Sequence, residues 1–161
     1  AAPRALAAAT AVGVRRERSS EGQRYGTRLH ALLEARAFAS DAQPVRLAGS
    51  TDQANVAIER QAQAILESAE LRQFFDPARF LRAFNEIELA LADGSTGRID
   101  RLVECPDGWW VIDYKSGAPA SAPLDEYSLQ VSRYCEAVGQ MFPARPVRGV
   151  LVFGNAQRID L

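Results

Sequence analysis

The chain has few of the residues from which specialised sites are built: its 161 residues include two cysteines, one histidine and one lysine. Two cysteines, Cys105 and Cys135, are too few for a disulfide framework or for a four-cysteine metal or iron–sulfur site. Their scarcity indicates a reducing compartment, here a cytoplasm of bacterial type. No apolar run approaches the roughly 20 residues that a membrane-spanning helix needs. The disulfide-rich, cluster-binding and membrane-spanning classes are therefore excluded.

A large excess of charge of either sign is also missing. The formal net charge is −1 and the pI is near 5.9, so the chain has no overall attraction to nucleic acid. This argues against a free-standing, non-specific DNA binder, although residues 1–36 carry seven arginines against three acids. A hydrophobic content of 47% with 24% charged residues is typical of a globular protein of one domain. We expect residues 21–161 to form that domain and residues 1–20 to be a linker or helix tail from a longer chain.

Lysine is the scarcest charged residue, because only one of the 19 Lys and Arg residues is a lysine, Lys115. No Gly-x-x-x-x-Gly-Lys-[Ser/Thr] loop is present to cradle a nucleotide phosphate, so the chain has no motor of its own. Arginine keeps its proton in proteins and has a wide planar head, whereas lysine is compact and has an adjustable pKa. A single lysine placed two residues after Asp113 in a strongly apolar strand therefore favours a chemical role over chance survival.

Hydrophobic periodicity predicts a chain in which helices and strands alternate. Helices are expected over residues 20–39, 52–66, 69–75 and 125–140, and strands over 85–91, 147–153 and both arms of a hairpin within 97–117. Residues 39–50 are expected to form a loop, with Thr51 as the N-cap of the second helix. The residues expected in the core include Phe74, Phe75, Phe80 and Phe84. The pattern predicts an α/β domain with a mixed sheet.

The hairpin is the stretch that carries chemistry. A turn at residues 106–108 separates two strands rich in β-branched and aromatic residues. Because side chains alternate along a strand, Asp113 and Lys115 share a face, and pairing of the two strands can bring Asp100 beside them. Two carboxylates at one place repel each other unless a divalent cation lies between them. A neighbouring lysine can orient water or stabilise added negative charge, so this constellation is suited to hydrolysing a phosphodiester.

Three other places offer candidate site residues whose roles the pattern leaves open. His30 is the only histidine, and a lone histidine on a half-apolar helix is more often packed or solvated than a ligand. Glu86 and Glu88 share one face of the strand before the hairpin, where either could face the metal or both could be solvated. Gln130 and Tyr134 lie on one polar stripe of the helix over 125–140, which can hold a phosphate or sugar or can be an ordinary helix surface.

Four segments together resemble the RecB-type nuclease domain of the PD-(D/E)XK superfamily, as found at the C-terminus of RecB and AddA helicase–nuclease subunits. They are GTRLHALLE (26–34), GRIDRLV (97–103), VIDYKSG (111–117) and YSLQVSRYCEAV (127–138), in the order of the family and with similar spacing. The resemblance implies a restriction-endonuclease-like fold, a mixed central sheet flanked by helices in the order α-α-α-β-β-β-α-β. A sister group with four cysteines around an iron–sulfur cluster does not match, because this chain has only two.

The resemblance also implies a site that binds Mg²⁺ or Mn²⁺. The implied metal ligands are His30, Asp100, Asp113 and the backbone carbonyl of Tyr114. The implied catalytic residues are Lys115, Asp113, Asp100, Gln130 and Tyr134, the last two as an accessory pair near the scissile strand. Glu86 resembles an acid at the start of the preceding strand in relatives, and the roles of Glu86 and Glu88 stay open.

The function implied is metal-dependent hydrolysis of DNA, as the nuclease domain of a helicase–nuclease in DNA repair or recombination. Its partners would be single-stranded DNA or unwound duplex ends, and a helicase that is fused upstream or supplied by a partner subunit. The choice between exonuclease and endonuclease, the polarity and the strand preference stay open. The alternative is a catalytically weak or inactive RecB-like domain that serves as a DNA-binding or scaffold module, which would be expected to lack a metal ligand or the lysine.

Overall fold

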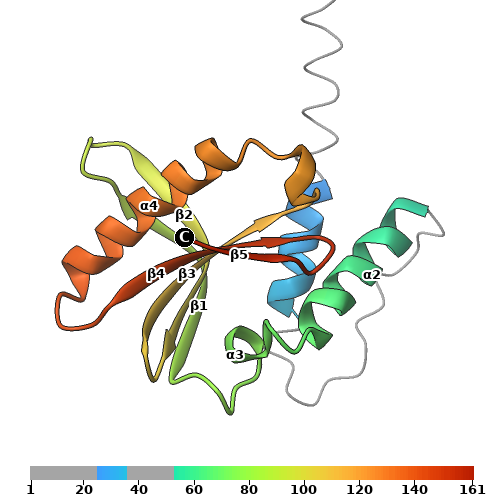
Figure 1. Cartoon of the computed structure of the whole chain (residues 1–161), viewed down its shortest axis with the longest axis horizontal. Coiled ribbons are helices and arrows are strands. Elements are labelled where there is room, and N and C mark those ends of the chain that lie inside the picture. Colours follow the sequence, from blue (N-terminus) through green and yellow to red (C-terminus); the bar gives the residue numbers. More distant parts are fainter. Residues whose placement is uncertain (1–24, 36–52) are drawn as a thin grey trace, which may run out of the picture.

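The computed structural model describes residues 25–35 and 53–161, which form a mixed sheet with helices on both sides (Figure 1). The strands are β1 (Arg82–Ala90), β2 (Thr96–Cys105), β3 (Gly108–Lys115), β4 (Val147–Phe153) and β5 (Arg158–Asp160). The helices are one over residues 25–35, α2 (Gln53–Glu67), α3 (Arg72–Phe75), the short 3-10 helix η1 (Pro119–Ser121) and α4 (Leu124–Met141). No described helix is both long and apolar enough to cross a membrane. The predicted fold class, an α/β domain with a mixed sheet flanked by helices, is confirmed.

The strands follow one another across the sheet in chain order, β1 to β5. The first three strands form two successive antiparallel pairs, and β4 then runs parallel to β3. Parallel neighbours need a long crossover, and α4 provides it. The short β5 returns antiparallel to β4 at the edge of the sheet.

Each face of the sheet has its own apolar core. Against one face pack the helix over residues 25–35, α2 and α3, with Leu29, Phe74 and Ile112 among the buried residues. Against the other face packs α4, through residues that include Val131 and Val138. Figure 1 shows the sheet between these two layers. A residue at the end of a central strand can therefore meet side chains from both layers.

The apolar stripes of the two helices that border the site explain their packing. Leu29, Leu32 and Leu33 recur at helical spacing in the helix over 25–35 and are all buried. Along α4, Val131 and Val138 are buried in the same way, seven residues apart. Asp125 and Glu126 in the first turn of α4 complement the positive end of the helix dipole. The opposite sides of both helices are left free to carry polar groups.

Several predicted boundaries agree closely with the structure, and some details differ. The helix predicted over 125–140 is Leu124–Met141 and the strand predicted over 147–153 is Val147–Phe153. The predicted loop over 39–50, the Thr51 cap and the outer parts of the helix over 20–39 lie outside the described residues. The helix predicted over 69–75 is reduced to the single turn α3, and β5 adds a strand after the predicted order ends.

The prediction that Phe84 lies in the core is wrong, whereas Phe74 and Phe75 are buried as expected. Phe84 is 42% exposed, and its ring stacks against that of Trp109 at 6.5 Å between centroids. Strand β1 lies at the edge of the sheet, so an apolar residue on it is covered on fewer sides. A count of apolar residues does not reveal which strand is the edge.

Candidate metal and catalytic site

The register of the sheet brings three acids into one row across β1, β2 and β3. Glu86 and Asp100 both lie between the ladder pairs Asn85–Arg101 and Ile87–Ile99 of β1 and β2. The pairing of β2 with β3 ends at Arg101 and Ile112, one residue short of Asp100 and Asp113. The ladder between the two hairpin strands therefore stops just before these acids, which leaves an opening between β2 and β3 beside Asp100 and Asp113.

Glu86 is one of two non-glycine residues with a positive φ in the described part of the chain, at 51°. A side chain in this left-handed region is strained, at a cost on the order of 1–3 kcal/mol, and such residues gather at functional sites. The register positions on either side of Glu86 are paired with β2, whereas Glu86 and Asp100 are not a ladder pair. The strand therefore departs from regular geometry at the residue whose carboxylate joins the site.

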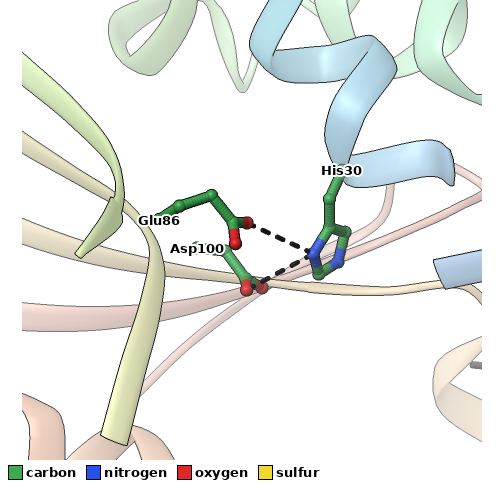
Figure 2. Close-up of side chains that lie close together, drawn as sticks. All are labelled: His30, Glu86 and Asp100. Atoms are coloured by element: carbon green, nitrogen blue, oxygen red, sulfur yellow. Dashed lines mark ion pairs between the residues drawn. The ribbon is translucent and has the colours of Figure 1, made fainter. Parts of the chain in front are cut away.

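The carboxylates of Glu86 and Asp100 meet His30, which the helix over residues 25–35 supplies from the other side of the opening (Figure 2). The imidazole Nδ1 lies 3.4 Å from Asp100 Oδ1 and 3.8 Å from Glu86 Oε1. One ligand atom from each residue lies within 4.8 Å of the other two. Atoms about 2.1 Å from a shared ion lie roughly 3–4 Å from one another, so this nitrogen and two oxygens fit a divalent cation.

Asp100 is buried and its carboxylate is held from two directions. The backbone N–H of Tyr114 donates a hydrogen bond of 2.8 Å to Oδ2, while Oδ1 faces His30. Burial raises the pKa of Asp100 to about 6, and the nearby charge of Asp113 adds to the rise. His30, the Tyr114 amide and Lys115 act in the opposite direction. Because the Asp100 carboxylate is buried and lies near a second carboxylate, binding of a cation here would be strongly favourable.

Asp113 lies beside this group but pairs with Lys115, at 2.7 Å between Oδ2 and Nζ. This oxygen is buried, and the ammonium of Lys115 satisfies its charge. Burial raises the pKa of Asp113 although the ammonium of Lys115 lowers it. Asp113 is not one of the three residues that cluster within 4.8 Å. The carboxylate of Asp113 therefore holds the Lys115 ammonium beside the three-residue cluster.

Helix α4 holds Lys115 from the other face of the sheet. Its Nζ donates to Gln130 Oε1 at 3.3 Å and lies 4.1 Å from the centre of the Tyr127 ring. Gln130 Nε2 in turn donates to the hydroxyl of Tyr134 at 3.1 Å. Tyr134 fits closely over β2 because position 97 is a glycine, where a Cβ would collide with the tyrosine ring. The lysine therefore occupies a fixed place at the edge of the opening.

A hollow of about 750 Å³ lies next to these groups. Its walls include His30, Lys115 and Arg98, with the chain from Ser116 to Gly117 and the ring of Tyr127. Of the described residues that line it, Arg98 and Lys115 are the two Lys or Arg side chains. A hollow with an imidazole and two basic groups on its wall can receive a phosphate of a larger substrate.

The structure thus divides the predicted site residues into two adjoining groups. His30 and Asp100 lie in the three-residue cluster, while Asp113, Lys115, Gln130 and Tyr134 form a connected chain of contacts beside it. The amide of Tyr114 binds Asp100, whereas a role for its carbonyl as a ligand stays a prediction.

Glu86 is the residue whose place the sequence left open. Periodicity puts Glu86 and Glu88 on one face, and the structure brings Glu86 to His30 and leaves Glu88 exposed. The register against β2 distinguishes the two, because it pairs Glu88 with Arg98 and leaves Glu86 unpaired beside Asp100. That register follows from the short turn between the strands, which was the available signal.

Residues 2–159 match the family model described as PD-(D/E)XK nuclease superfamily. A search of curated proteins gave no match.

Proposed function

Because the chain belongs to the PD-(D/E)XK nuclease superfamily, we propose that it is a metal-dependent deoxyribonuclease of the RecB type. The observation that carries the proposal is the convergence of His30, Glu86 and Asp100 beside the pair of Asp113 and Lys115. The sequence contains every side chain that the resemblance implies as a metal ligand, and it contains the lysine. This disfavours an inactive module that only binds DNA.

The metal would be held by His30, Glu86 and Asp100, with Asp113 as a further ligand beside them. When bound, the cation supplies charge that polarises a phosphate and lowers the pKa of an attacking water. Oxygen donors suit Mg²⁺, and the nitrogen of His30 makes Mn²⁺ a candidate activator as well. The carbonyl of Tyr114 remains a proposed ligand on the strength of the resemblance alone.

The chain's own groups would hold and stabilise the substrate at this place. Lys115 stands at the edge of the hollow, where its ammonium can orient water or offset charge that develops on a phosphate. Gln130 keeps Lys115 and Tyr134 connected, so α4 fixes the position of the amine rather than leaving it to solvent. Fixed positioning of this kind lowers the reorganisation needed in the transition state.

We further propose that the domain works with a helicase, fused upstream or in a partner subunit, in DNA repair or recombination. The four RecB-like segments support this, as does the lack of a nucleotide-binding loop in a chain of net charge −1. Single strands or unwound duplex ends would then be delivered to the hollow. The free thiols of Cys105 and Cys135 are in keeping with a reducing compartment such as the cytoplasm.

The proposal is tested by incubating the purified chain with linear single- and double-stranded DNA in Mg²⁺, in Mn²⁺ or in EDTA. Cleavage is expected with either metal and none in EDTA. Asp113→Ala and Lys115→Ala are each expected to abolish cleavage and to leave the circular dichroism spectrum of the fold unchanged. Arg79→Gln, which alters an exposed ion pair with Asp76, is the control and should cleave normally. Cleavage that persists in EDTA, or in either site variant, would overturn the assignment.

A further inference from the structure

Arg98 is a basic residue of the site to which neither the fold nor the proposed chemistry gives a role. It lies on β2 two residues before Asp100, its side chain is 55% exposed, and it lines the hollow that also contains His30 and Lys115. Register sets it opposite Glu88. Its guanidinium nevertheless reaches diagonally to Glu86, with Nη1 at 2.9 Å from Oε2.

Each of the two carboxylate oxygens of Glu86 therefore has a basic side chain beside it. Oε2 is bound by Arg98, and Oε1 faces His30 in the metal cluster. An exposed ion pair is weak in water because solvent screens it. A divalent cation that is also held by His30 and Asp100 would draw the charge of Glu86 more strongly. Arg98 at Oε2 and a cation at Oε1 would share the single negative charge of Glu86, so metal binding would weaken the Arg98–Glu86 pair.

An arginine that loses this partner would be left facing the hollow. A guanidinium can bind two oxygens of a phosphate at once, which an ammonium cannot do in the same fixed geometry. Lys115 is already engaged by Asp113 and Gln130. Arg98 is then the described basic residue of the hollow that can turn to a substrate phosphate without breaking a buried contact.

We propose that Arg98 binds a backbone phosphate of the nucleic acid, and that Glu86 withholds it until a metal occupies the site. The inference rests on the proposed function. Because coupling between two ligands is reciprocal, metal and nucleic acid would strengthen each other's binding by the same factor. Removal of Arg98 would separately strengthen metal binding, because Arg98 would no longer draw on the charge of Glu86.

Two equilibrium measurements on the full chain test the coupling. Binding of Mn²⁺ alone is followed by calorimetry, and binding of a fluorescein-labelled, nuclease-resistant phosphorothioate oligonucleotide is followed by anisotropy with and without Mn²⁺. Arg98→Gln is expected to bind Mn²⁺ roughly fivefold more tightly than wild type, and to lose roughly fivefold of the gain in oligonucleotide affinity that Mn²⁺ gives. Without Mn²⁺ the variant should bind the oligonucleotide almost as wild type does.

The matched control is Arg79→Gln, because Arg79 is equally exposed at 54%, is paired with an acid and is not among the residues lining the hollow. It should match wild type in both measurements. A second background, Glu86→Gln, separates a general effect of charge from competition for this carboxylate. In that background Arg98→Gln should tighten Mn²⁺ binding much less.

The outcomes are distinct. If wild type binds Mn²⁺ and cleaves DNA while Arg98→Gln behaves like Arg79→Gln, the role of Arg98 is overturned and the proposed function stands. Equal tightening of Mn²⁺ in the wild-type and Glu86→Gln backgrounds also overturns it, since the effect would not pass through Glu86. If wild type binds no Mn²⁺ and cleaves nothing, both proposals fail together.

Discussion

At the scale of single residues, Lys115 is defined by three neighbours of different kinds. A carboxylate, an amide oxygen and an aromatic ring surround its Nζ at 2.7, 3.3 and 4.1 Å. These contacts suit a small ammonium that donates in several directions. The chain otherwise uses arginine for its positive charge, so this position is where size and shape matter most.

Lys115→Arg should therefore fail although it keeps the charge. The guanidinium is too wide for the space between Asp113, Gln130 and the Tyr127 ring, and it has to displace at least one of them. We expect a loss of cleavage rate of roughly 100-fold or more, with an unchanged far-UV spectrum. Single-turnover rates at saturating Mn²⁺ measure this. A variant with more than about half of the wild-type rate would show that charge alone is sufficient.

Asp100 gives the clearest dependence on pH. Its pKa in the folded chain, about 6, is raised above the ordinary value of 3.8. The protonated form is thus favoured by folding, and its stabilisation is fully present below pH 3.8 and is lost as the pH rises through about 6. Above that pH the ionised, buried Asp100 costs at most roughly 3 kcal/mol, because one pKa unit corresponds to about 1.4 kcal/mol.

Asp100→Asn tests this sign. The amide keeps an oxygen for the Tyr114 N–H but cannot ionise, so in EDTA at pH 7.5 the variant should be more stable than wild type by about 1–3 kcal/mol. At pH 4 the difference should be small. Denaturant unfolding at both pH values measures it. A variant that is less stable than wild type at pH 7.5 contradicts the prediction.

At the scale of secondary-structure elements, the approach of α4 to β2 sets the position of the catalytic groups. Tyr134 of α4 lies where a Cβ at Gly97 would be, and Tyr134 is linked through Gln130 to Lys115. A side chain at position 97 would move the tyrosine or the whole helix. The packing of α4 on β2 therefore sets the position of the Lys115 amine.

Gly97→Ala is expected to destabilise the fold by about 1–3 kcal/mol through overpacking, and to slow cleavage even where the variant is fully folded. Gly139→Ala is the control on α4, the helix that carries Tyr134, since its added Cβ would meet only Val147 at 3.9 Å. That control should gain up to about 1 kcal/mol because alanine favours a helix. Denaturant unfolding and cleavage rates of the two variants check the pair. Equal stability of both would contradict the close fit at Gly97.

Most of the secondary-structure elements could be predicted from the sequence. The 106–108 turn and the alternation around it were enough to predict the central hairpin, and apolar spacing predicted α4 within one residue at each end. The three-residue strand β5 is too short to show a period. The same patterns could not decide between Glu86 and Glu88, because that choice depends on cross-strand register. Nor could they show that the hairpin strands part at Asp113, so that its nearest partner is Lys115.

At the scale of the whole molecule, the site lies where the two layers meet through the sheet. His30 comes from the helix over residues 25–35, the three acids come from three strands, and the partners of Lys115 come from α4. In the site His30 faces two acids, and its ring also lies edge-on to that of Tyr114 at 5.3 Å between centroids. A cation bound by all three residues would therefore fasten that helix to the sheet.

Mn²⁺ should for this reason stabilise the whole fold, and the effect should depend on His30. At a concentration of 100 times its dissociation constant, a ligand that binds only the folded state adds about 2.7 kcal/mol. We expect wild type to melt at a higher temperature in Mn²⁺ than in EDTA, as measured by calorimetry. His30→Gln should melt near the wild-type temperature in EDTA, because glutamine can fill the half-buried position, but should gain little from Mn²⁺. Equal gains in the two proteins would mean that the helix does not share in holding the ion, and the acids alone would then have to account for metal binding.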